Sequence, residues 1–135
     1  MASNAERRDS LKIILYGQPI TKKNSSRLIT VNGRKIPIPS RAYKAYEQNC
    51  LEQLRYIYGK REIINKPVNV CCVYFMQTRR RKLDLINLQQ ATLDILKAGD
   101  VIADDCHEIV VSLDGSRVLY DPENPRVEIT ITEIA

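Results

Sequence analysis

A helix predicted at residues 84–97 constrains the fold more than any other segment. Asp84 stands where an N-cap or first-turn acid is favoured, and Gly99 stands where helices often end in the left-handed conformation. At ~100° per residue, the polar side chains share one narrow sector and the apolar ones fill most of the remaining circumference. Such a wide apolar arc predicts a sheet on one side of the helix and a further body, such as a partner subunit, on another. The polar sector comprises Asn87, Gln90, Asp94 and Lys97, and the apolar arc comprises Leu85, Ile86, Leu88, Ala91, Leu93, Ile95 and Leu96.

The remaining hydrophobic pattern predicts strands on both sides of this helix. They lie at residues 11–16, 68–76, 107–113, 117–120 and 127–131. Asn32-Gly33 predicts a β-hairpin within residues 27–37, and Ser40 is the expected N-cap of another helix, which runs to about residue 58. The nearly continuous apolar run at residues 68–76 is typical of a strand covered on both faces. We therefore expect an α+β fold, in which two main helices pack on a mixed sheet.

Length and charge indicate a single basic domain. A chain of 135 residues is large enough to bury a core unaided. Residues 1–10 are polar and lack an apolar period, so we expect a flexible N-terminus followed by one domain over residues 11–135. The formal net charge of +5 favours an anionic partner such as nucleic acid.

Several classes of site find no support in the sequence. The four cysteines show no CxxC spacing, so neither a zinc site nor a disulfide framework is indicated, and we expect reduced thiols in a cytoplasm. No signal peptide or membrane-length apolar run is present, so no membrane partner is expected. Glycine-rich phosphate loops, dinucleotide fingerprints and nucleophilic triads are also missing, so no small-molecule cofactor is expected.

Acidic residues bracket the helix predicted at residues 84–97. If the chain turns back after Gly99, the pair Asp104-Asp105 returns beside the first turn of the helix and faces Asp84. Carboxylates that converge from separate elements form an oxygen-ligand site suited to Mg²⁺ or Mn²⁺. Such an ion polarises a phosphodiester and activates water. Asp94 would stand ~15 Å from Asp84 along the helix, too far to share one ion. It is expected either to pair with a cation such as Lys97 or to order a loop.

Basic residues lie directly before Asp84, where they are placed to hold the phosphates of a nucleic acid. A basic loop after the first strand adds two more cations. The alternative for all of them is an ordinary solvated surface. The predicted phosphate-binding residues are Arg79, Arg80, Arg81, Lys82, Lys22 and Lys23.

This stretch resembles the RusA family of Holliday junction resolvases, which are common in prophages. The resemblance rests on RRRK, then Asp84-Leu-Ile-Asn87, then Asp94, a helix stop and Asp104-Asp105. It implies a small homodimeric endonuclease that cuts four-way DNA junctions in recombination and repair, in the cytoplasm of a bacterium or phage-infected cell. The resemblance also implies Mg²⁺, with Mn²⁺ as a possible substitute. Asp84 matches the first metal-binding aspartate and Asp105 the later catalytic one, with Asp104 its neighbour, and Asn87 and Asp94 complete the motif.

Two positions depart from the family pattern. Many members carry an aspartate where this chain has Ile86 and a functional lysine where it has Gln90. Either another acid substitutes, with Asp104 and Asp114 as candidates, or activity is reduced or lost. A non-catalytic module that binds branched DNA is therefore the main alternative, and a basic RNA-binding domain is another.

Overall fold

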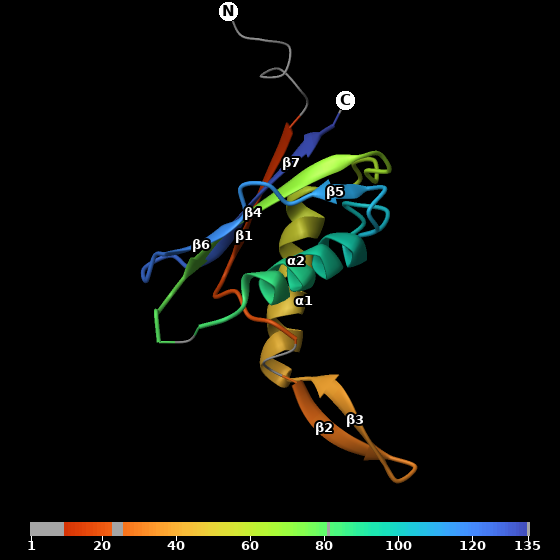
Figure 1. Ribbon diagram of the computed structural model, residues 1–135, viewed down its shortest axis with the longest axis vertical. Coiled ribbons are helices and arrows are strands. Elements are labelled where there is room, and N and C mark those ends of the chain that lie inside the picture. The colour runs from red at the N-terminus through yellow and green to blue at the C-terminus, as the bar shows by residue number, and fades with distance from the viewer. Residues whose placement is uncertain (1–9, 23–25, 81, 135) are drawn as a thin grey trace, which may run out of the picture.

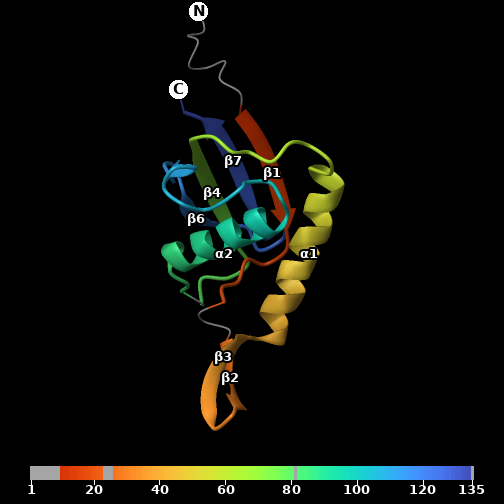
Figure 2. The ribbon, with the colours of Figure 1, turned by 90° about the vertical axis from the view of Figure 1, so that its right-hand side faces the viewer.

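The computed structural model describes residues 10–22, 26–80 and 82–134. A five-stranded sheet carries both helices on one face, and a two-stranded hairpin projects beyond them (Figures 1 and 2). The predicted α+β fold with a mixed sheet and two helices is confirmed. The elements, in chain order, are β1 Ser10–Tyr16, β2 Ser26–Val31, β3 Arg34–Pro39, α1 Arg41–Ile57, β4 Val68–Met76, α2 Leu85–Ala98, β5 Val110–Ser112, β6 Arg117–Tyr120 and β7 Arg126–Glu133. Residues 1–9, Lys23 and Arg81, for which we made predictions, lie outside the described residues.

Strand β4 is the centre of the sheet. It pairs antiparallel with β7, which in turn pairs with β1, and parallel with both β5 and β6. Its residues alternate between buried and half-buried, and only the buried set, which includes Cys72 and Tyr74, lies in the hydrophobic core. The prediction that helices or sheets cover both faces of this strand is therefore wrong for the described residues of a single chain.

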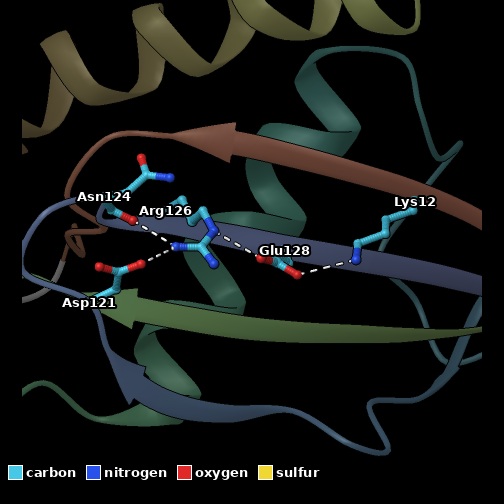
Figure 3. Close-up of polar contacts among 5 residues, drawn as sticks. All are labelled: Lys12, Asp121, Asn124, Arg126 and Glu128. Atoms are coloured by element: carbon cyan, nitrogen blue, oxygen red, sulfur yellow. Dashed lines mark hydrogen bonds and ion pairs between the residues drawn. The ribbon is translucent and has the colours of Figure 1, made fainter.

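The uncovered face of the sheet carries a charged row (Figure 3). Arg126 lies over the Phe75 ring, 3.8 Å from its centroid, and its guanidinium pairs with Asp121 and Glu128 at 2.8 Å each. Lys12 reaches the other oxygen of Glu128 at 3.2 Å. These pairs let charged side chains lie across a half-buried aromatic surface.

Local sequence signals account for the hairpin and for α1. Asn32 and Gly33 both have positive φ, 51° and 76°, as a two-residue hairpin turn requires. The Ser40 hydroxyl accepts a hydrogen bond from the Tyr43 amide at 3.1 Å and caps α1, as predicted. The strand predicted at residues 107–113 begins later, because a turn closes between Cys106 and Ile109.

Helix α2 differs from its predicted pattern in two respects. Ile86 was placed in the apolar arc but is 77% exposed, while Gln89 and Thr92 are buried. Gly99 has φ −87°, so it is Asp100, with φ 57°, that takes the left-handed conformation. Gly99 has another function: a Cβ there would lie 2.8 Å from Leu54 Cδ1, which shows how closely α1 approaches the end of α2.

No helix within the described ranges is long and apolar enough to cross a membrane.

Candidate active site

Asp84 begins α2 without serving as its side-chain cap. The residue is extended and exposed, and its side chain makes no capping hydrogen bond. Instead, Asn87 Nδ2 donates to Asp84 Oδ2 at 3.3 Å. The Asp84 carboxylate is thus turned toward the polar face of the helix, where Asn87 lies one turn before Gln90.

Gln90 joins two carboxylates in the middle of that face. Its Nε2 donates to Asp94 Oδ1 at 3.0 Å and to Asp105 Oδ2 at 3.2 Å. The first contact is one helical turn away, whereas the second crosses to the segment after α2. Asp94 and Asp105 therefore face the same amide nitrogen.

Two buried residues determine where Asp105 returns. Val101 and Ile102 enter the core after Gly99, and the Val101 carbonyl accepts from the Ile64 amide at 2.9 Å. Ile64 also accepts from the Ala103 amide at 2.9 Å. The chain turns back as predicted, but this anchor brings Asp105 beside the middle of α2. The prediction that the acidic pair faces the first turn is corrected accordingly.

Asp104 and Asp105 contact different parts of α2. Asp104 pairs with Lys97 in the last turn, Oδ1 to Nζ 3.1 Å, and the same oxygen accepts from the Asp105 amide at 2.8 Å. The hydrogen bond from Lys97 lowers the pKa of Asp104, and the same bond raises the pKa of Lys97. Lys97 thus pairs with Asp104. Asp94 pairs with a cation as predicted, but that cation is Lys22, at 3.3 Å.

Lys22 forms the opposite wall of the site. Its Nζ lies 3.3 Å from Asp94 Oδ2 and 5.7 Å from the centroid of the buried Tyr43 ring. The loop that carries it is tied to the end of β4, because Gln18 Oε1 accepts from the Gln77 amide at 2.7 Å. A cavity of about 210 Å³ opens between this loop and α2, lined by Lys22, Asn87, Gln90, Ala91 and Asp94.

The basic run lies in the segment between β4 and α2. Arg79, Arg80 and Lys82 are exposed, and none of the three takes part in an ion pair with another described residue. Arg79 stacks on Tyr120, 4.2 Å from the ring centroid. Exposed cations without acidic partners are suited to phosphate.

The structure assembles the predicted acids only in part. Within the described residues, no three acidic, histidine or cysteine side chains converge as a metal-binding group. Asp84 and Asp94 instead lie along the polar face of α2, each bonded to an amide side chain, and Asp105 reaches that face from the segment after α2 and bonds to Gln90. Asp114, the other candidate substitute, lies in a turn held by Asn69, whose side chain bonds to both the amide and the carbonyl of Asp114.

Sequence reasoning missed that Gln90 bonds both Asp94 and Asp105 and so brings the two carboxylates together. Gln90 and Asp94 had been placed in the polar sector of the helix, and that shared sector was the available signal. The ~15 Å along the helix separates Asp94 from Asp84, but it does not separate Asp94 from Asp105, because both carboxylates accept from Gln90.

Comparison with known families identifies the chain. Residues 17–132, most of the sequence, match the family described as "Endodeoxyribonuclease RusA". No curated protein sequence matches the chain significantly. The matched region includes the Lys22 loop, the basic run, all of α2 and Asp105. The chain therefore belongs to the RusA family of endodeoxyribonucleases.

Proposed function

We propose that this chain is a Mg²⁺-dependent endonuclease that resolves four-way DNA junctions in recombination and repair. Family membership supports DNA as the partner and phosphodiester cleavage as the reaction. One structural observation carries the proposal further. Gln90 holds Asp94 and Asp105 together beside the 210 Å³ cavity that Lys22 faces.

The donor chemistry of this site fits Mg²⁺. Carboxylate and amide oxygens are hard ligands, and Mg²⁺ is commonly bound through one or two carboxylates, with substrate phosphate and water completing its set. Asp84 and Asp105 would hold the ion, as the family resemblance implies, and Asp94 adds a carboxylate next to Asp105. Mn²⁺ accepts the same ligands and is expected to substitute. When bound, the ion would supply an activated water and stabilise the charge that develops on the phosphate.

Each protein residue has a distinct task in this mechanism. Asn87 orients Asp84, and Gln90 orients Asp105 until substrate enters. Asp104 forms an ion pair with Lys97, and the same carboxylate accepts a hydrogen bond from the Asp105 amide. Asp104 would thus position Asp105. Lys22 is half-buried against Asp94 and can turn its ammonium group toward an incoming phosphate.

The basic run would fix the DNA strand at the mouth of the site. Arg79, Arg80 and Lys82 lie directly before Asp84, so phosphates bound there lead the strand toward the carboxylates. The Arg79–Tyr120 stack gives this surface an aromatic component on which an unpaired base can lie.

Homodimerisation is part of the proposal. A symmetric dimer can place one site on each of two opposed strands of a four-way junction. The first turn of α2 supports a contact there, because Ile86 exposes a large apolar side chain beside Asp84. The proposed setting is the cytoplasm of a bacterium or phage-infected cell.

A non-catalytic module that binds branched DNA is the second candidate. Two observations favour it: Ile86 supplies no carboxylate on the exposed face, and Gln90 places a neutral amide between Asp94 and Asp105. Such a protein would keep its preference for junctions and lack cleavage.

Cleavage of a labelled synthetic four-way junction distinguishes the two candidates. Purified protein is incubated with the junction or a matched linear duplex, in Mg²⁺, Mn²⁺ or EDTA. Paired nicks on opposed strands, lost with EDTA and with Asp105→Asn, are expected of a resolvase. Tight junction binding without nicks in either metal would show that the binding module is the correct assignment.

A further inference from the structure

The β2–β3 hairpin stands apart from the main body of the protein. Among the described residues, its two strands form a separate sheet and pair only with each other. The hairpin projects from the end of the molecule at which α1 begins (Figures 1 and 2). An isolated two-stranded hairpin is marginally stable in water. A hairpin that projects into solvent is therefore expected to be stabilised by a partner that binds it.

Both faces of the hairpin expose apolar side chains. The register places Ile29 opposite Ile36 on one face and Leu28 opposite Pro37 on the other. Leu28 is 64% exposed and Ile36 is 40% exposed. A partner must consequently offer apolar surface to the hairpin from two sides, as the walls of a groove do.

The charge of the hairpin selects the chemistry of that partner. Residues 26–39 contain Arg27, Arg34 and Lys35 and no Asp or Glu. Arg34 and Lys35 are exposed near the tip, and neither forms an ion pair with any residue in the described ranges. A second copy of this chain, itself carrying +5, is a poor match for an arm without acids. A polyanion with grooves is a good match.

Duplex DNA has the required dimensions. Its major groove, about 12 Å wide, admits a two-stranded β-ribbon. Six residues in each strand give the ribbon a length of about 20 Å, which corresponds to about six base pairs. Sugar and base edges cover apolar side chains in such a groove, while Arg and Lys bind its phosphate rims.

The root of the hairpin lies beside the candidate active site. Ser26 follows Lys22 by four residues, so their Cα atoms are at most about 14 Å apart. The other end of the hairpin leads through Ser40 into the first turn of α1, where Tyr43 lies under Lys22. Duplex DNA leaving the site therefore meets the hairpin at its root.

We infer that the β2–β3 hairpin is a duplex-binding arm, which lies in the major groove of the DNA flanking the cut and holds its phosphates with Arg34 and Lys35. Only one part of this inference rests on the proposed function, namely that the bound duplex flanks a cleavage site. Binding of the arm to duplex DNA does not depend on cleavage.

The test uses Arg34→Gln/Lys35→Gln in the full chain, with Arg55→Gln/Lys60→Gln as a matched control. The control removes one exposed Arg and one exposed Lys at the opposite end of α1. Dissociation constants are measured against salt concentration for a four-way junction and for a linear duplex. Loss of two phosphate contacts is expected to reduce the log–log salt slope by about 2 for each bound subunit, on both DNAs. The control is expected to keep the wild-type slope.

Hydroxyl-radical footprinting provides the second measurement. Wild type is expected to protect the crossover and several base pairs of flanking duplex, and the hairpin variant only the crossover. Slopes and footprints of the hairpin variant that equal those of wild type would overturn the inference. It would also be overturned if wild type sedimented as a dimer and the hairpin variant as a monomer, because the hairpin would then bind a second copy. Failure of wild type to cleave junctions would count against the proposed function alone, because the slope on linear duplex still reports on the arm.

Discussion

Asp104 and Asp105 are adjacent in the chain, yet their side chains contact α2 two turns apart. Asp104 meets Lys97 near the end of the helix, and Asp105 meets Gln90 near its middle. An acidic pair that reads as one ligand set in the sequence is therefore two residues with different environments.

This division predicts unequal effects of removing each charge. Asp105→Asn is expected to reduce cleavage of a saturating four-way junction by at least about a hundredfold, because Asp105 is the proposed metal ligand that Gln90 holds beside Asp94. Asp104→Asn is expected to reduce it by less than about tenfold, because Asn can still accept from the Asp105 amide. Single-turnover rates measure both. Equal losses would show that Asp104 is itself a ligand.

Ile86→Asp is expected to strengthen the metal site. Ile86 is exposed and lies one helical turn before Gln90, so an aspartate there adds a carboxylate to the same face of α2 at little steric cost. The Mg²⁺ concentration that gives half-maximal cleavage is expected to fall several-fold. Ile86→Asn is the control, because it matches the shape of aspartate without the charge. An identical response of the two variants would exclude an electrostatic effect.

Gly99→Ala is expected to destabilise the fold by about 1–3 kcal/mol, the usual cost of overpacking. The backbone at Gly99 tolerates alanine, but the new Cβ would lie 2.8 Å from Leu54 Cδ1 and 3.2 Å from the Ile95 carbonyl oxygen. Urea unfolding measures the change. Adding Leu54→Val to Gly99→Ala should recover part of the loss, and full additivity of the two substitutions would argue against this contact.

The charged row on the open sheet face predicts acid sensitivity. Burial would raise the pKa of Glu128, but its bonds to Arg126 and Lys12 outweigh that effect and lower the pKa below its ordinary 4.5. A carboxyl with a lowered pKa stabilises the fold above its unfolded pKa, and this contribution is lost as pH falls through the folded value. The melting temperatures of wild type and Glu128→Gln should therefore converge below pH 4.5. Parallel curves down to pH 3 would contradict this.

Features encoded by adjacent residues were predictable from the sequence. Ser40 caps α1, Asn32-Gly33 turns the hairpin, and the apolar run of β4 gives the central strand. Each depends on residues close together in the chain. The polar sector of α2 was also read correctly, since helical periodicity alone determines it.

Features that depend on distant contacts were not predictable. The position along α2 at which Asp105 contacts the helix depends on the hydrogen bond between Val101 and Ile64, a residue that precedes β4. The exposure of Ile86 depends on which side of α2 the sheet covers. The close approach of α1 to the end of α2 at Gly99 involves Leu54, which belongs to the other helix. None of these partners is marked by spacing or composition.

Gly99 also has a consequence for how this protein can diverge. Lys22, in the loop after β1, contacts both helices that meet closely at Gly99: it lies over Tyr43 of α1 and pairs with Asp94 of α2 at 3.3 Å. A side chain at position 99 would spread the helices and widen the cavity without touching DNA. Selection on cleavage would then act on a residue that neither binds substrate nor reacts, and substitutions at positions 54 and 99 would be expected to arise together.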